Sequence, residues 1–386
     1  MPRRHRGLVH VPTFLVLLGL TGCGAAATAP SAPPASTAGS AKPAGSSAAA
    51  GASAAGASFA AVLEGAKKEG KVVSWGLFPI EADGPKVQQA FNQRFGTNIQ
   101  LEINPVAATE VNGRVTAEAQ AGRYNVDVIP TAESGREADL VQRGLVAKTD
   151  WVGLFGKELP DIQEAAAETL PTLQGYGPKF YDAGYALVYN TKQVKPADLP
   201  SRFADLTDAK YRGKLALIAD GSPFQLLAVD PGLEPAGAEQ LLTSLAANKP
   251  LLQSSAPTVV DVVSRGEVPF GIADYLTILT GKANGQPVDI RILDYIPSDS
   301  RYMVPMARAP HPNAALLYGA WVVTEGMPLF GELKHTFRLT QPNNPLSQVI
   351  QEQNPSAKRV LPKDEADVAK VNDFRAKASA ILTGAK

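Results

Sequence analysis

The stretch NVDVIPTAESGREADLVQRGLV, residues 125–146, contains the unit that decides the fold of this chain. Its apolar run from Val126 to Ile129 has the length and composition of a buried strand. A polar loop follows, and the spacing then predicts a helix from Ser134 to Gly144, because glycine commonly ends a helix. A strand that leads through a loop into a helix is half of a βαβ unit, in which the next strand runs parallel to the first.

The same alternation of helix and strand fills the chain before this unit. Ser58 can cap a helix that ends at Gly70, and residues 71–75 then read as a short buried strand. The alternating apolar residues of 98–104 predict a further strand. The pattern predicts an α/β fold with a mainly parallel sheet covered on both faces. Helices are expected from apolar residues at three- and four-residue spacing, namely Phe59, Val62, Leu63 and Ala66, then Val87, Phe91 and Phe95, then Val111, Val115 and Ala119.

A second alternation follows a different middle region. Residues 175–190, GYGPKFYDAGYALVYN, are rich in glycine and tyrosine and strand-like, and a turn-rich stretch leads on from them. Two α/β units joined by extended segments indicate two lobes with a cleft between them. In the second part of the chain we expect strands at 215–218 and 268–272, and helices at 236–246, 258–265, 312–324, 345–351 and 365–382.

Composition and charge narrow the classes of function. The 386 residues are 45% apolar and 19% charged, which gives room for two domains and ample core. The 37 basic and 37 acidic side chains leave no positive surplus to neutralise phosphates, so we expect no nucleic-acid partner. Cys23 is the single cysteine, which excludes an intramolecular disulfide and a cysteine-cluster metal site. The four histidines leave little material for a histidine-based metal site or a catalytic triad.

Residues 1–22 have the form of a secretory signal peptide. Three arginines precede an apolar stretch, residues 7–20, that is too short to span a bilayer with ease. The residues LTGC at 20–23 match the bacterial lipobox, which implies cleavage before Cys23 and lipidation of its thiol. The other interpretation is an ordinary signal peptide with an incidental thiol. The arginine pair near the start leaves export by the general secretory route or by the twin-arginine route open.

Cleavage before Cys23 would leave 34 basic and 37 acidic side chains, a net charge of −3. Residues 24–58 contain only Gly, Ala, Ser, Thr, Pro and the single Lys42. Such a segment cannot bury enough apolar surface to offset its ordering entropy, and its four prolines and five glycines argue against an alanine-rich helix. We therefore expect 23–58 to be a lipidated cysteine followed by a disordered tether, which spans roughly 30–35 Å root-mean-square.

Five segments of the body carry a recognisable pattern. The most specific is ALVYNTKQVKPADLPSRFADLTDAKYRGKLAL, residues 186–217, with a Tyr-Asn-Thr turn, a Leu-Pro, an Asp-Leu and a Gly-Lys-Leu. The others are LEGAKKEGKVVSWG (63–76), the 125–146 unit, SRGEVPFGIADY (264–275) and APHPNAALLYGAWVVTEG (309–326). In this order they resemble the extracellular solute-binding proteins of ABC importers, in the branch with iron(III)-, thiamine-, polyamine- and phosphonate-binding members. The resemblance covers about 59–386.

The resemblance implies a two-lobed periplasmic-binding-protein fold of type II, in which two α/β lobes are joined by two hinge crossings around a ligand cleft. Tyr181–Asn190 would be the first crossing and Asp294–Tyr302 the second. The implied parts are lobe 1 at 59–182 plus about 299–330, lobe 2 at 183–298, and C-terminal helices at 331–386 that pack across the lobes.

The function implied by the resemblance is capture of a small polar or charged solute and its delivery to an ABC permease with its ATPase subunit. We expect a monomer outside the cytoplasm, at the cell surface or in the periplasm, held to a membrane by lipidated Cys23. We expect no enzyme activity and no cofactor, with iron(III) as one possible transported solute. No G-x-S-x-G, P-loop, H-E-x-x-H or strand-linked G-x-G-x-x-G motif occurs. A ligand-sensing lipoprotein or an enzyme on the same fold is the alternative.

The loops after strands supply the candidate ligand residues, because ligands of open α/β sheets bind beyond the carboxyl ends of strands. Each candidate also has a structural interpretation, since aromatic residues can be core, hydroxyls can cap helices, and acids can be solvated loop charges. The candidates are Trp75, Phe78, Glu81, Thr131 and Glu133 in lobe 1, and Ser222, Phe224, Gln253, Ser254, Asp274 and Tyr275 in lobe 2.

Two ligand chemistries stay open at this point. Hydroxyls near helix starts, such as that of Ser222, favour an oxyanion, which the helix dipole also favours. Carboxylates such as those of Glu133 and Asp274 instead suit a cation or a hard metal ion. Iron-binding members of the family place an adjacent tyrosine pair just after the strand that aligns with 268–273. This chain has the single Tyr275 there, which leaves iron(III) as one candidate solute among several.

Overall fold

The computed structural model describes residues 58–76, 82–106, 108–130, 136–341 and 344–384. Ten strands in these residues form one sheet in the order β2-β1-β3-β9-β4-β7-β5-β6, with β10 beside β9 and β8 beside β4. The strands are β1 (Lys71–Trp75), β2 (Gln100–Asn104), β3 (Val128–Pro130), β4 (Lys179–Asn190), β5 (Leu215–Ile218), β6 (Leu251–Gln253), β7 (Phe270–Asp274), β8 (Val288–Arg291), β9 (Tyr295–Pro305) and β10 (Lys358–Val360).

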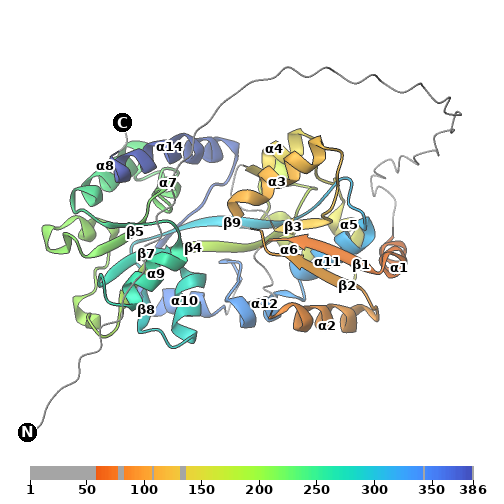
Figure 1. Ribbon diagram of the computed structural model, residues 1–386, viewed down its shortest axis with the longest axis horizontal. Helices are drawn as coiled ribbons and strands as arrows, with labels where there is room; N and C mark the ends of the chain where they lie inside the picture. The colour runs from red at the N-terminus through yellow and green to blue at the C-terminus, as the bar shows by residue number, and fades with distance from the viewer. Residues whose placement is uncertain (1–57, 77–81, 107, 131–135, 342–343, 385–386) are drawn as a thin grey trace, which may run out of the picture. The chain divides into compact units, whose positions relative to one another are not determined.

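Fourteen α-helices of the described residues cover this sheet (Figure 1). The first eight in chain order are α1 (Phe59–Glu69), α2 (Gly84–Phe95), α3 (Ala108–Gln120), α4 (Arg136–Gln142), α5 (Trp151–Phe155), α6 (Ile162–Ala167), α7 (Phe224–Leu227) and α8 (Glu234–Ala247). They continue with α9 (Ala256–Ser264), α10 (Tyr275–Ala283), α11 (Pro312–Val322), α12 (Met327–Lys334), α13 (Pro345–Gln353) and α14 (Glu365–Thr383).

The long strands β4 and β9 run side by side between two groups of shorter strands (Figure 1). Strands β1, β2 and β3 belong to lobe 1, and strands β5, β6, β7 and β8 belong to lobe 2. The first half of β4 pairs with β9, and its second half pairs with β7 and β8. The end of β9 then pairs with β3. The two predicted hinge crossings and the two-lobed α/β fold are therefore confirmed.

The sheet is mixed in direction, which refines the expectation of a mainly parallel sheet. In lobe 1, β1 is parallel to both β2 and β3, and in lobe 2, β5 is parallel to both β6 and β7. The crossing strands are antiparallel to each other and to β3, β7 and β8. The physical reason is the chain path, since it leaves lobe 1 through β4 and returns through β9 in the opposite direction.

The start of the body folds as its sequence predicts. The hydroxyl of Ser58 accepts a hydrogen bond of 3.3 Å from the backbone N–H of Ala61, and so caps α1. Val62 and Ala66 form the buried face of this helix. Gly70 ends it with a φ of +64°, a left-handed conformation that glycine adopts without steric cost.

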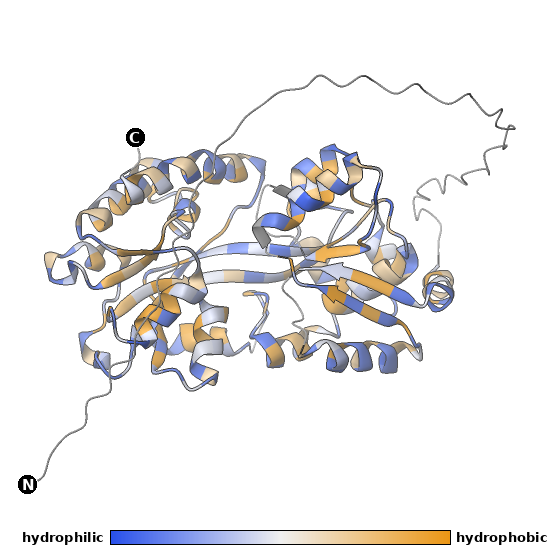
Figure 2. Cartoon of the chain, viewed as in Figure 1, coloured by the Kyte–Doolittle hydropathy of each residue, from blue (hydrophilic) through white to orange (hydrophobic). Residues whose placement is uncertain are grey.

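The apolar residues gather in the strands and on the helix faces that cover them, while the outer helix faces are hydrophilic (Figure 2). One core cluster lies in lobe 2, and the C-terminal helix α14 contributes Val371, Phe374, Ala378 and Leu382 to it. Helix α14 packs there against α7 and α8. Within the described residues, every helix is too short or too polar to cross a membrane.

Candidate functional site

The paired crossing strands present a polar cluster on one face of the sheet. In the pairing of β4 with β9, Tyr181 lies opposite Arg301, and Asp299 precedes Arg301 by two residues on β9. In the pairing of β4 with β7, Tyr185 lies opposite Asp274. Directly opposite residues of antiparallel strands, and residues two apart on one strand, point to the same face. These five residues therefore share one face at the junction of the two lobes, and we call them the floor cluster.

The opposite face of the same strands is closed. Asp182 is 1% exposed, and its carboxylate accepts hydrogen bonds from the hydroxyl of Ser300 at 2.7 Å and from the backbone N–H of Leu339 at 2.8 Å. The ammonium group of Lys179 lies 2.9 Å from the same carboxylate. The segment that follows α12 thus covers this face around Asp182, which makes the face with the floor cluster the candidate for ligand binding.

The floor cluster holds its charges in a largely desolvated place. Arg301 forms an ion pair with Asp299, and the two side chains are 14% and 12% exposed. Burial alone would lower the pKa of Arg301, but the negative charge of Asp299 outweighs burial and the pKa is raised. Burial raises the pKa of Asp274, against hydrogen bonds from the N–H and hydroxyl of Thr277 that lower it.

The two phenols of the floor cluster keep their protons at neutral pH. Burial raises the pKa of Tyr181 to about 12, although the nearby Arg301 works in the opposite direction. Burial also raises the pKa of Tyr185, and the charge of Asp274 adds to that effect. Both side chains therefore offer a neutral hydroxyl and an aromatic face to a ligand rather than a phenolate.

A small cavity of about 40 Å³ opens on the lobe 2 side of the floor cluster. Helix α14 contributes Arg375 to its lining, and the Nε of Arg375 donates a hydrogen bond of 3.2 Å to the side-chain oxygen of Gln225 on α7. Gln225 in turn lies 3.4 Å from the hydroxyl of Ser222. The other polar residues that line the cavity are Tyr185, Asp299 and Arg301.

The loop after β5 reaches this cavity through an unusual backbone position. Gly221 has a φ of +82°, and a side chain there would collide with Ala378 of α14. Glycine therefore allows the loop to pass directly against α14. Asp220 fixes the turn by accepting a hydrogen bond of 2.8 Å from the backbone N–H of Ser222.

The structure brings some of the predicted ligand residues to the floor cluster and leaves others elsewhere. Ser222 and Asp274 lie there, and Gln253 adjoins the same loop, because its carbonyl accepts a hydrogen bond of 2.9 Å from the N–H of Ala219. Ser254 is exposed beside Gln253. Four predicted residues and the predicted lipidation site fall outside the described residues, namely Phe78, Glu81, Thr131, Glu133 and Cys23.

Three predicted aromatic residues pack in the core. Trp75 is 2% exposed with the guanidinium of Arg114 over its ring at 4.1 Å, and Phe224 is fully buried. Tyr275 is 1% exposed, and its hydroxyl donates a hydrogen bond of 2.9 Å to the carbonyl of Asp182. The participation of every predicted residue in ligand binding stays a prediction.

Sequence reasoning missed most of the floor cluster. Tyr181, Tyr185, Asp299 and Arg301 lie in stretches that were predicted only as hinge crossings. Their spacing carried a signal, because Tyr181 and Tyr185 are four residues apart and Asp299 and Arg301 are two apart, so each pair lies on one strand face. No local signal pointed to Arg375, since only the packing of α14 brings it to this place.

The part of the chain that the structure describes offers few side chains that could bind a metal ion together. No group of three or more histidine, cysteine, aspartate or glutamate side chains gathers there closely enough to hold a metal ion.

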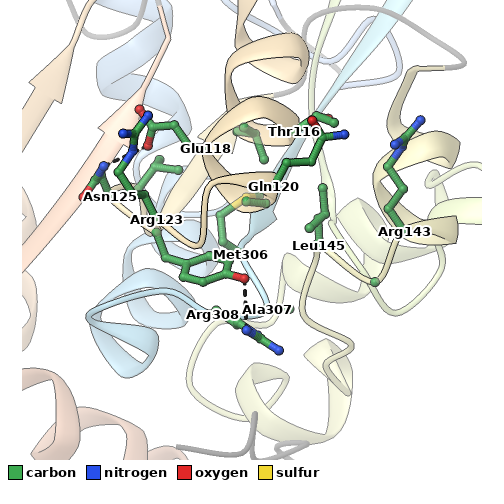
Figure 3. Close-up of a pocket in the computed structure, with 15 residues that line it drawn as sticks. Thr116, Glu118, Gln120, Arg123, Asn125, Arg143, Leu145, Met306, Ala307 and Arg308 are labelled. Carbon is green, nitrogen blue, oxygen red and sulfur yellow. Dashed lines mark hydrogen bonds between the residues drawn. The ribbon is translucent and has the colours of Figure 1, made fainter. Parts of the chain in front are cut away.

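A larger pocket of about 300 Å³ lies in lobe 1, and Figure 3 shows its lining. Arg123, Arg143 and Arg308 surround it, and Arg308 donates a hydrogen bond of 3.0 Å to the hydroxyl of Tyr124. The pocket lies at the C-terminal ends of α3 and α4, where cations complement the helix dipoles. The pocket also lies at the amino end of β3, where the chain enters that strand. Ligands of open α/β sheets instead bind beyond the carboxyl ends of the strands. The floor cluster is therefore the better candidate site.

The chain matches one sequence family, and its fold is similar to that of several solved structures. A model of the bacterial extracellular solute-binding proteins matches residues 79–327, more than half of the chain. Iron-bound HitA from Pseudomonas aeruginosa superposes with a TM-score of 0.63 at 20% identity, covering 81% of this chain and 99% of its own.

Two further solved structures resemble the chain to a similar degree. The substrate binding protein of an ABC transporter from Agrobacterium tumefaciens has a TM-score of 0.62 at 14% identity, and the match covers 81% of this chain and 96% of that one. The Trichodesmium protein IdiA (FutA), solved with iron and citrate ligands, has a TM-score of 0.58 at 15% identity, with coverages of 82% and 99%. No curated protein sequence matches. At these identities the structural likeness establishes the fold alone.

Proposed function

The chain belongs to the bacterial extracellular solute-binding proteins, and we propose that it is the solute-binding component of an ABC importer. In this proposal it captures a small polar or charged solute on the floor cluster by hinge closure, and it delivers the solute to a membrane permease that works with an ATPase subunit. The observation that carries the proposal is the placement of five polar side chains where β4 and β9 cross between the lobes.

Hinge closure follows from the way in which the lobes are connected. Two neighbouring strands join them, so a small change in the backbone of β4 and β9 moves one lobe relative to the other. A solute that contacts both lobes binds the closed form better and shifts the population toward it. To convert an equilibrium of 1:99 into 99:1, the solute must favour the closed form by about 5.5 kcal/mol.

Iron(III) remains one candidate solute. HitA and the Trichodesmium protein were solved with iron bound, and their folds are similar to this one. Carboxylates of Asp274 and Asp299 suit a hard trivalent ion. Because the pKa of Tyr181 is raised to about 12, an iron(III) ion would have to displace its proton before the phenol could coordinate.

A solute screen tests the proposed function. The mature protein would be heated with iron(III), iron(III) citrate, thiamine, spermidine, inorganic phosphate and methylphosphonate in separate samples. A solute that binds the folded state alone stabilises it by about 2.7 kcal/mol at a hundred times its Kd, so we expect a saturable rise in Tm for one class. Failure of every class to shift Tm would count against the proposed role.

Membrane attachment is proposed to depend on Cys23. We expect Cys23→Ala to move the protein from the membrane fraction to the soluble fraction, because two or three acyl chains hold a protein far more firmly than none. The Tm of the body should not change, since the sequence predicts that the folded body begins near Ser58, well after Cys23. Ser36→Ala, in the same stretch of sequence, should stay with the membrane. Equal retention of the wild type and Cys23→Ala would rule out the lipid anchor.

A further inference from the structure

We infer that residues 335–341, which we call the back strap, hold the hinge open, and that Tyr275 fastens the back strap to lobe 2. The inference rests on the proposed function and names what sets the balance between its open and closed forms. Tyr275 is 1% exposed, and its hydroxyl is bonded on the side of the sheet that faces away from the floor cluster. It therefore acts on solute binding through the hinge, as a positioning residue.

The back strap is part of a third connection between the two lobes. Helix α12 before it belongs to lobe 1, where Glu332 forms an ion pair of 2.7 Å with Lys86 of α2. Helix α13 after it is bonded to lobe 2. The side chain of Gln353 accepts a hydrogen bond of 2.9 Å from the N–H of Ile292 and donates one of 3.2 Å to the carbonyl of Ile290 in β8. After β4 and β9, the chain thus passes between the lobes once more.

The back strap lies beside β4 and on the face opposite the floor cluster. The carbonyl of Phe337 accepts a hydrogen bond of 3.0 Å from the backbone N–H of Asp182, and the N–H of Leu339 donates one of 2.8 Å to the Asp182 carboxylate. In Figure 1, α10 and α12 lie on this side of β4 and β9, whereas α3, α4 and α14 lie on the other. Closure over the floor cluster bends the crossing strands toward that cluster, so groups on the side of the back strap must move apart.

Tyr275 makes a contact that links the two lobes across the back of the hinge. It is the first residue of α10 in lobe 2, and its hydroxyl donates a hydrogen bond of 2.9 Å to the carbonyl of Asp182 and lies 3.4 Å from the carbonyl of Phe337. The back strap is fastened to lobe 1 as well, because the guanidinium of Arg338 donates a hydrogen bond of 2.8 Å to the carbonyl of Val323. Such a contact is made in the open form and is weakened by closure.

Loss of the Tyr275 hydroxyl should therefore favour the closed form and tighten solute binding. When the form that binds is a minor population, the apparent affinity is reduced by that fraction, so a larger fraction gives a higher affinity. One net hydrogen bond corresponds to a change of about two- to tenfold in an equilibrium. A direct contact between Tyr275 and the solute predicts the opposite sign, namely weaker binding by Tyr275→Phe.

The test follows the distance between the lobes in the absence of solute. The mature protein would carry Cys23→Ser, so that two introduced cysteines are its only thiols. Gln120→Cys on α3 and Thr243→Cys on α8 are exposed positions in lobe 1 and lobe 2. Donor and acceptor dyes at these positions report closure as a population with high transfer in single-molecule energy-transfer measurements.

Three variants are compared in this labelled protein. Tyr275→Phe keeps the ring and removes the hydroxyl. Tyr318→Phe is the matched control, because it removes the hydroxyl of a buried tyrosine in α11 of lobe 1. Thr340→Val loosens the back strap at its other end, since the exposed Thr340 donates a hydrogen bond of 2.6 Å to Glu168 of lobe 1. Melting curves would show that each variant is folded.

We expect the high-transfer population to grow about two- to tenfold in Tyr275→Phe, to grow in Thr340→Val, and to equal that of the wild type in Tyr318→Phe. Among iron(III) citrate, thiamine, spermidine and methylphosphonate, a probe that binds the wild type should bind Tyr275→Phe more tightly.

An unchanged or smaller high-transfer population in folded Tyr275→Phe, or weaker binding of such a probe, would overturn the inference. Thr340→Val decides in the same way if Tyr275→Phe does not fold. The proposed function fails separately, if no solute of the screen raises the Tm of the wild type or moves it into the high-transfer population.

Discussion

Asp127→Ala is expected to lower the free energy of unfolding by about 3–5 kcal/mol. Asp127 is fully buried, and its carboxylate accepts a hydrogen bond of 2.7 Å from the backbone N–H of Val73 in β1. It also accepts one of 2.7 Å from the backbone N–H of His311, and it lies 2.8 Å from the Nδ1 of the same residue. Alanine would leave buried donors of β1 and of the start of α11 without an acceptor.

Urea denaturation of the wild type and the variant measures this loss. Asp139→Ala is a suitable control, because Asp139 pairs with Arg143 on the exposed side of α4 and surface ion pairs contribute about 0–1 kcal/mol. The control should therefore unfold within about 1 kcal/mol of the wild type. A loss in Asp127→Ala as small as that in the control would show that this carboxylate does not tie α11 to the sheet.

Asp182→Ala should cost a comparable amount, about 3–5 kcal/mol, for a different reason. Asp182 is the buried partner of Lys179, whose side chain is only 4% exposed. Without Asp182, the ammonium group of Lys179 would keep only Glu168, at 3.1 Å, and the N–H of Leu339 would lose its acceptor. The substitution leaves the buried ammonium group with a single carboxylate and leaves the N–H of Leu339 and the hydroxyl of Ser300 without their acceptor, which is why the expected loss is large.

Asp182→Ala should also loosen the backbone locally, beside the crossing strands. Hydrogen exchange at the amide of Leu339 should accelerate, because that N–H is held by the carboxylate that is removed. Asp289→Ala is the control, since Asp289 pairs with Lys282, whose side chain is 52% exposed. Unchanged exchange at Leu339 would show that Asp182 does not fasten the segment after α12 to the crossing strands.

Local sequence patterns predicted the alternation of helices and strands, while the two-lobed arrangement was expected from the family resemblance. The apolar spacing of α1, its cap at Ser58 and its end at Gly70 are all short-range features, and they fold as expected. The first crossing also stands out in composition, because the Gly- and Tyr-rich stretch of β4 differs from the strands inside the lobes, whereas the second crossing was expected from the family resemblance. Features of this kind depend on neighbours within a few residues, so the sequence displays them directly.

The site was harder to predict because it depends on which way each side chain points. Asp274 was expected in a loop after its strand, but it is the last residue of β7 and also caps α10. The helix therefore begins at once, and Tyr275 points to the opposite side, where its hydroxyl bonds to Asp182. Arg375 depends on long-range packing, since its hydrogen-bond partner Gln225 is 150 residues away.

The most direct test of the central claim is small-angle X-ray scattering of the mature protein, with and without the solute that raises its Tm most in the screen. A solute held between the lobes must draw them together, because it binds the closed form better than the open one. The account predicts a smaller radius of gyration at saturation and no change with a solute that leaves Tm unaltered. An unchanged scattering profile at saturating solute would contradict capture by hinge closure.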